Sequence, residues 1–240
     1  MERIDRRRHY IMVLDTETAN TMDDPLVYDI GWAVVDKYGN VYETASFINI
    51  DVFYHERDMM ASAYYADKID RYIADIDAGI RTVSNMYSIR KALIDTLNRW
   101  GIKEVACHNA RFDRLALNTT LRWQTKSRYR NFFPRGIEIW DTMKMARDVI
   151  LPMPTYKLFC ETHQLFTKTG KIPLTAEVLY RFIINDADFV ESHTGLEDVL
   201  IEKEILAYCF RQHKKMRKKL FDKPFTTPYK DPFQWIKHLY

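Results

Sequence analysis

The chain has 240 residues, of which 47% are apolar and 29% charged, and its formal net charge is +3 at pH 7. This is ordinary globular composition, and seven glycines and eight prolines exclude the collagen-like and low-complexity classes. Three widely separated cysteines (Cys107, Cys160 and Cys209) exclude a disulfide framework and a CxxC zinc site, and they favour a reducing compartment.

No apolar run approaches the roughly 18 residues that a membrane-spanning helix needs. The charged start MERIDRRRHY is unlike a signal peptide. We therefore expect a cytoplasmic protein with no membrane contact. Because the sequence shows neither an internal repeat nor a Gly/Ser/Pro-rich linker, we predict one domain over residues 1–220. An aromatic and proline-rich C-terminal tail is predicted over 221–240.

Short apolar runs predict strands in the first fifty residues. Residues 10–14 (YIMVL) form a continuous apolar run, which is typical of a strand buried on both faces. Residues 27–36 and 41–50 are predicted to be two more strands, joined by the turn sequence KYGN as a hairpin.

The rest of the chain alternates between helical and strand patterns. Residues 52–100 are predicted to be helical, ending at Gly101. Short strands at 104–107 and 137–140 enclose a helix at 111–121, and the chain is then predicted to be mostly helical to about residue 219. Three meandering strands followed by this alternation predict an α/β protein with a mixed sheet flanked by helices.

Two carboxylates follow the first strand directly. Alternate residues of a strand point to one face, so Asp15 and Glu17 project the same way with Cα atoms about 7 Å apart. Two acids at the end of a buried strand repel each other and lose hydration, and a metal ion is the usual compensation. The alternative is chance, because one Asp-x-Glu is expected in a chain this rich in acids.

A third acid, Asp113, follows the strand at 104–107 and lies in the first turn of the next predicted helix. It is either a third carboxylate at the same edge of the sheet or an acid that the helix dipole favours. Asp141, after the strand at 137–140, is interpreted as a helix N-cap.

The segment SHTGLEDVLIE combines a histidine with an acid. Thr194 and Glu197 fit a capping box with Thr194 as N-cap, which makes His193 and Asp198 the two positions of a hydrophobic staple, and these meet in space. An imidazole and a carboxylate there suggest a functional pair. The alternative is an ordinary polar histidine.

The motifs DTET, HNARFD and HTGLED, in this order, resemble the DEDDh family of 3′→5′ exonucleases, which includes the proofreading epsilon subunit of bacterial DNA polymerase III, oligoribonuclease and RNase T. The resemblance covers about residues 10 to 210 and implies an RNase H-like fold with two Mg²⁺ or Mn²⁺ ions. It implies that Asp15, Glu17 and Asp198 hold the first ion, that Asp15 also bridges to the second, and that Asp113 holds the second through waters. His193 would be the histidine that accepts a proton from the attacking water.

Basic and aromatic residues are interleaved over residues 111–135, which suits a single nucleic-acid strand whose phosphates are neutralised and whose bases stack. The alternative is a solvated helix end and loop over an aromatic core. The candidate nucleic-acid contacts are Thr16, Thr18, Asn109, Phe112, Arg122, Lys126, Arg128 and Arg130.

The expected function is a metal-dependent 3′→5′ exonuclease that releases nucleoside monophosphates from single-stranded or frayed DNA. One alternative is an exoribonuclease acting on short RNA, and another is a non-catalytic nucleic-acid- or polymerase-binding module. We expect a stand-alone member of the family, of the kind that a phage encodes for the host cytoplasm, with the tail as a contact for a polymerase or another replication protein.

Overall fold

The computed structural model describes residues 4–221, and within them six strands form one mixed sheet in the order β4-β3-β2-β1-β5-β6. β1 pairs antiparallel with β2 and β2 with β3, whereas β5 runs parallel to β1, β6 to β5, and β4 to β3. The predicted three-strand meander and mixed sheet are confirmed. The strands are β1 (Ile11–Asn20), β2 (Pro25–Val35), β3 (Val41–Asn49), β4 (Thr82–Ser84), β5 (Glu104–Cys107) and β6 (Glu138–Asp141).

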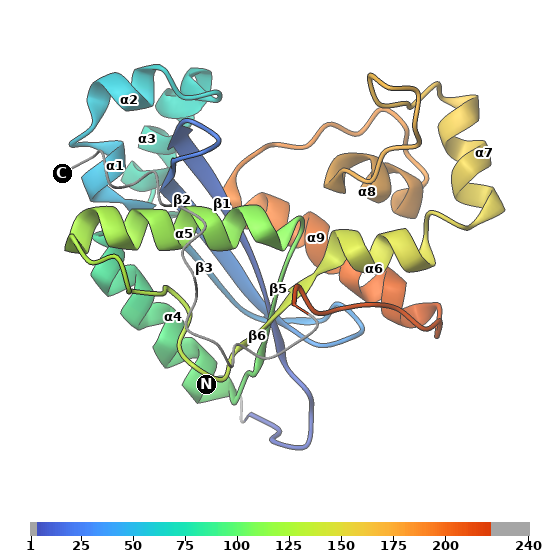
Figure 1. The fold of residues 1–240 in the computed structure, drawn as a ribbon, viewed down its shortest axis with the longest axis horizontal. Coiled ribbons are helices and arrows are strands. Elements are labelled where there is room, and N and C mark those ends of the chain that lie inside the picture. Colours follow the sequence, from blue (N-terminus) through green and yellow to red (C-terminus); the bar gives the residue numbers. More distant parts are fainter. Residues whose placement is uncertain (1–3, 222–240) are drawn as a thin grey trace.

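Helices cover both faces of the sheet and build two lobes above it (Figure 1). α4 (Met86–Trp100) and α5 (Ala110–Thr125) lie on one face, and α6 (Thr142–Val149) and α9 (Gly195–Arg211) lie on the other. The lobe beside the β1–β2 hairpin contains α1 (Ile50–Phe53), α2 (Arg57–Ala61), the 3₁₀ helix η1 (Ala66–Lys68) and α3 (Ile69–Asp77). The opposite lobe contains α7 (Pro154–Thr162) and α8 (Ala176–Ile184).

The alternation of β1 divides the core into two layers. Ile11 and Val13 are fully buried in the cluster that α6 and α9 complete, whereas Met12 and Leu14 are fully buried in the cluster under α4 and α5. By the same alternation, Asp15 and Glu17 point to the face of the sheet that α9 covers, and Thr16 points to the face that α5 covers.

The structure corrects the predicted end of the first strand. β1 continues through the acidic motif to Asn20, because β2 pairs with it antiparallel over its whole length. Along its other edge, β1 pairs with β5 only at Met12 and Val13. The edge of β1 that carries the acids is therefore open toward α5 and α9, beyond the carboxyl end of β5.

Two helical predictions were too broad. Residues 82–84, predicted to be helical, form β4, because they pair parallel with the end of β3. Residues 141–219, predicted to be mostly helical, contain irregular segments between α7, α8 and α9, and α9 ends at Arg211. The predicted N-cap role of Asp141 is confirmed, since its carboxylate accepts the backbone N–H groups of Met143 and Lys144.

The N-terminus of α9 lies directly against β2. A Cβ atom on Gly31 would lie 2.4 Å from the backbone nitrogen of Leu196, so only glycine allows this approach. The backbone N–H of Gly195 donates to the buried Asp29 Oδ2 at 2.8 Å. The contact places the first turn of α9 beside the acidic end of β1.

No helix among residues 4–221 is long and apolar enough to cross a bilayer. The predicted tail, apart from Phe221, lies outside the described residues, and so does the polymerase contact predicted for it. The division into a domain over 1–220 and a tail stays a prediction.

Candidate active site

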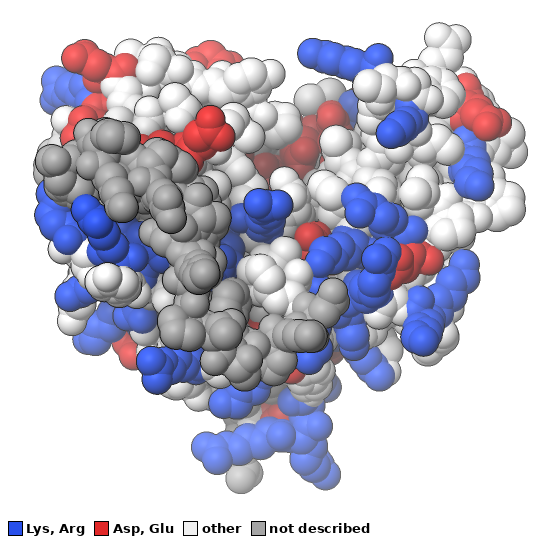
Figure 2. Space-filling model, viewed as in Figure 1, with Lys and Arg blue, Asp and Glu red and all other residues white. Residues whose placement is uncertain are grey.

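Carboxylates from three elements converge beside the open edge of β1. β1 contributes Asp15 and Glu17, the first turn of α5 contributes Asp113, and the first turn of α9 contributes Asp198. The charges of all three other acids act on Asp15. Figure 2 shows acidic side chains recessed in the hollow between the two lobes, with basic side chains on the body around it.

One side of this cluster offers ligands for a cation. Single ligand atoms of Glu17, His193 and Asp198 all lie within 4.8 Å of one another. Asp198 Oδ1 is buried and has no hydrogen-bond partner among the described residues. Carboxylate oxygens are the ligands that Mg²⁺ and Mn²⁺ prefer, so this donor set fits a hard divalent cation.

Asp113 lies on the α5 side and is held by β1. Its Oδ1 accepts the hydroxyl of Thr16 at 2.9 Å, and both side chains are buried. The alternation of β1 explains the pairing, because Thr16 points to the opposite face from its two acidic neighbours. The side chain of Thr16 is therefore enclosed beneath Asp113, and contact of Thr16 with nucleic acid stays a prediction.

Burial and mutual repulsion raise the pKa values of these acids. Burial, followed by the charge of Asp198, raises the pKa of Glu17 to about 9. Burial, followed by the charge of Glu191, raises the pKa of Asp198 to about 8. Burial raises the pKa of Asp113 to about 7 against the opposing hydrogen bond from Thr16. The pKa of Asp15 is also raised, by burial first and then by Glu202. A bound cation would reverse these shifts by stabilising the ionised forms.

Sequence reasoning missed Glu202, a further acid of the cluster. It lies four residues after Asp198 on α9, so the two share one helix face. Glu202 is buried, and its carboxylate accepts the backbone N–H of His108 at 3.1 Å. This contact ties α9 to the turn that begins α5. The i, i+4 spacing from Asp198 was the available sequence signal.

His108 precedes Asp113 by the same spacing as His193 precedes Asp198, but its imidazole has its partners outside the acidic cluster. The imidazole of His108 lies 2.9 Å from Thr142 Oγ1 and 2.7 Å from the carbonyl oxygen of Leu174, away from Asp113. Burial lowers the pKa of His108. It is a neutral residue with structural partners on both ring nitrogens.

The predicted pairing of His193 with Asp198 is confirmed as a juxtaposition, but the capping box is not formed. Thr194 is the N-cap residue of α9, yet its hydroxyl donates to Glu197 Oε2 at 2.6 Å. The first N–H group of the helix is capped by Asp29 instead. A long-range acceptor on β2 thus replaces the local cap.

His193 has an unusual backbone and a lowered pKa. Its φ of 50° lies in the left-handed region, which non-glycine residues rarely occupy. Burial, followed by the charge of Lys68, lowers the pKa of His193. The imidazole is therefore neutral at neutral pH and can accept a proton.

The predicted nucleic-acid contacts divide into two groups. Thr18, Asn109 and Phe112 flank the acidic cluster in sequence and keep exposed surface. Arg122 and Lys126 lie near the other end of α5, about 14 to 20 Å along the helix axis from Asp113. The exposed Arg128 and Arg130 follow them in the next loop. Contact of either group with nucleic acid stays a prediction.

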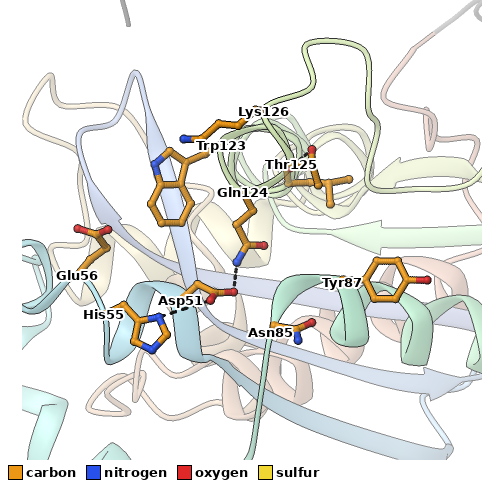
Figure 3. Close-up of a pocket in the computed structure, with 10 residues that line it drawn as sticks. Asp51, His55, Glu56, Asn85, Tyr87, Trp123, Gln124, Thr125 and Lys126 are labelled. Carbon is orange, nitrogen blue, oxygen red and sulfur yellow. Dashed lines mark hydrogen bonds and ion pairs between the residues drawn. The ribbon is translucent and has the colours of Figure 1, made fainter. Parts of the chain in front are cut away.

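A cavity of about 550 Å³ lies at the far end of α5. In Figure 3, Gln124 reaches Asp51 across this cavity, with Trp123 and Lys126 on the α5 side and Tyr87 at the start of α4. The converging carboxylates are at the opposite end of α5. The cavity is therefore separate from the acidic cluster.

Solved structures share this fold. Exonuclease I from Methylocaldum szegediense aligns with a TM-score of 0.54 at 15% identity, over 86% of this chain and 41% of that one. A zinc-bound complex of E. coli ExoI with single-stranded DNA aligns with a TM-score of 0.50 at 11% identity, over 86% of this chain and 42% of that one. The chain thus spans about two fifths of each structure, and the likeness shows an RNase H-like α/β fold. No family model matches the chain, and no curated protein matches it in sequence.

The buried acids predict that the metal-free protein loses stability as pH rises. Unfolded carboxyls release their protons near pH 4, about their ordinary pKa. The folded acids hold theirs up to a pKa of about 9 for Glu17. The folded state binds more protons within this window, so the free energy of unfolding falls as pH increases through it. Thermal melting in EDTA should show a lower Tm at about pH 9 than at about pH 6.

A double variant provides the control for this effect. Glu17→Gln combined with Asp198→Asn removes two of the titrating groups and should flatten the dependence of Tm on pH. Mn²⁺ should raise the Tm of the unmodified protein most at the alkaline end, because the ligands bind it in their ionised forms. A Tm that is flat with pH in EDTA would contradict the raised pKa values.

Proposed function

We propose that this protein is a DEDDh-type 3′→5′ exonuclease that uses two divalent cations and acts on single-stranded DNA or a frayed 3′ end. The observation that carries the proposal is the meeting of Asp15, Glu17, Asp113 and Asp198 beside His193, although they come from three separate segments. Buried acids destabilise a fold unless they are compensated, and a non-catalytic module has no use for them.

The fold supports the same activity class. The two structures named above are exonucleases, and the E. coli structure is a complex with single-stranded DNA. That substrate class, together with the basic and aromatic residues at 111–135, favours a single strand here. A ribonuclease would use the same acids, so a comparison of DNA and RNA strands as substrates must decide between the two.

The donor set indicates how the cations would be held. Glu17 and Asp198 would hold one ion and Asp113 the other, with Asp15 between them. Two such ions neutralise charge on the scissile phosphate and the leaving oxygen, and they lower the pKa of a bound water. Thr16 keeps the Asp113 carboxylate oriented through its 2.9 Å hydrogen bond.

His193 is the proton acceptor in this proposal. Its lowered pKa keeps the imidazole neutral, so one ring nitrogen can take the proton of the attacking water. Its Nδ1 lies 3.7 Å from Glu191 Oε2, which would stabilise the imidazolium that forms. The hydroxide attacks phosphorus, the bond to the leaving 3′ oxygen breaks, and a nucleoside 5′-monophosphate is released.

Cleavage should depend strictly on Asp15 and on a divalent cation. Asp15→Ala should abolish hydrolysis of a labelled oligonucleotide in Mg²⁺ or Mn²⁺, because Asp15 is the carboxylate that would serve both ions in the proposed mechanism. Asp95→Ala, which changes an exposed acid on α4, should keep full activity. Full activity in excess EDTA, or in Asp15→Ala, would contradict the mechanism.

Polarity is a separate prediction. A 5′-labelled single strand should give a ladder that shortens progressively from its 3′ end, because the proposed site acts on a free terminus. DNA and RNA strands of one sequence, run in parallel, decide the preferred sugar. Cleavage of a closed circular single strand would identify an endonuclease instead.

Removal of His193 should slow the chemistry and spare metal binding. General-base catalysis contributes about 10²- to 10⁴-fold, so kcat of His193→Ala should fall within that range with little change in nucleic-acid affinity. His213→Ala is a matched control, since His213 also has a left-handed backbone but lies exposed beyond the C-terminus of α9. If His193→Ala instead loses Mn²⁺ affinity in calorimetry, His193 is a metal ligand and not the base.

A further inference from the structure

The lobe segment between β3 and α4 brings an aromatic ring onto His193. Tyr65, just before η1, stacks on the imidazole with ring centroids 4.7 Å apart and ring planes 16° from parallel. The two residues are 128 positions apart in sequence, so only the packing of this lobe against the start of α9 brings them together. Aromatic rings in contact stabilise each other beyond the effect of their area burial.

Lys68, the last residue of η1, fixes the backbone beneath the same imidazole. Its Nζ donates to the carbonyl oxygen of Ser192 at 2.7 Å and to that of His193 at 3.4 Å. The same Nζ lies 3.9 Å from the centroid of the Tyr65 ring. One ammonium group thus joins the stacked ring to the chain that carries His193.

The backbone of His193 needs such support. A non-glycine residue in the left-handed region is strained, and such a conformation persists only where surrounding contacts determine it. His193 precedes the N-cap of α9 and follows an irregular stretch, so no helix or strand ladder holds it. The contacts of Lys68 and Tyr65 supply the missing constraint on its main chain and its ring.

The lobe is itself tied to the helix that carries Asp198. Arg71 of α3 lies 3.2 Å from Glu197 of α9. Arg81, whose side chain is 1% exposed, lies 3.0 Å from Glu197 and 3.1 Å from Asp29 of β2. Tyr65 and Lys68 therefore belong to a segment that forms ion pairs with Glu197. Glu197 lies next to Asp198 in the first turn of α9.

We propose that Tyr65 and Lys68 are positioning residues that hold the His193 imidazole toward the acidic cluster. The inference rests on the proposed function, because it concerns how the proton acceptor of that reaction is oriented. Neither residue belongs to the motifs that resemble known exonucleases. They act through His193, and a base that is misplaced by about 1 Å loses about a hundredfold in rate.

Four variants distinguish the contributions of the Tyr65 ring, the Tyr65 hydroxyl and the Lys68 charge. Tyr65→Leu removes the stack, Tyr65→Phe keeps it and removes only the hydroxyl, and Lys68→Met keeps the side-chain stem and removes the ammonium. Tyr38→Leu is the matched control, since it makes the same change at a tyrosine that is 63% exposed in the turn between β2 and β3. Circular dichroism and thermal melting verify that each variant folds.

Kinetics provide the first readout. We expect kcat to fall about ten- to hundredfold in Tyr65→Leu and Lys68→Met with KM nearly unchanged, whereas Tyr65→Phe and Tyr38→Leu stay near wild type. The double variant Tyr65→Leu/His193→Ala should have the same kcat as His193→Ala alone, because Tyr65 acts only by positioning His193. Additive losses, or a wild-type kcat in Tyr65→Leu, would overturn the proposal.

A second readout does not require activity. In the metal-free protein, the His193 ring-proton signals are assigned by their disappearance in His193→Ala, and they should move in Tyr65→Leu but not in Tyr38→Leu. Signals that stay in place would show that the stack does not form, which overturns the proposal whatever the kinetics. Absence of hydrolysis by the wild-type protein would overturn the proposed function instead, and the ring signals would still report on the stack.

Discussion

The approach of α9 to β2 is the contact on which the site depends. Gly31 lets the backbone of Leu196 come to a distance that any Cβ atom would prevent, and Asp29 caps the first N–H of the helix. The contact fixes where the first turn of α9 lies relative to the neighbouring β1. Asp198 is brought beside Glu17 as a consequence, although the two are 181 residues apart in sequence. The buried Arg81 then joins this turn to the lobe that carries Tyr65.

Two kinds of buried acid are found near this contact. The charge of Asp29 is compensated by Arg81 at 3.1 Å, by the hydroxyl of Tyr72 at 2.8 Å and by the N–H of Gly195. Asp198 lies instead among like charges, and the carboxylates of Glu191 and Glu197 act on it. Burial raises the pKa of both acids, but a guanidinium and two hydrogen-bond donors oppose the rise at Asp29, whereas neighbouring acids add to it at Asp198. This difference separates structural acids from those we propose as metal ligands.

Local patterns predicted most of the sheet and the central residues of the candidate site. The meander, the short parallel strands, the helix that begins before Asp113 and the pairing of His193 with Asp198 all follow from periodicity and helix-start signals. The predictions failed where a distant partner decides the outcome. β4 forms because β3 offers it an edge, β1 continues past residue 14 because β2 pairs with it, and the cap of α9 comes from β2 and not from Thr194.

By itself, the sequence determined the fold class and predicted four acids and a histidine as the candidate site, because these follow from residue type, spacing and the order of the motifs that resemble known exonucleases. Only the tertiary structure decided what surrounds them. Glu202 accepts the backbone N–H of His108, Thr16 is enclosed beneath Asp113, and Tyr65 stacks on His193, since each contact joins segments that no local pattern relates. The raised pKa values belong to the same class of result, because desolvation and repulsion depend on how closely the folded chain packs its charges.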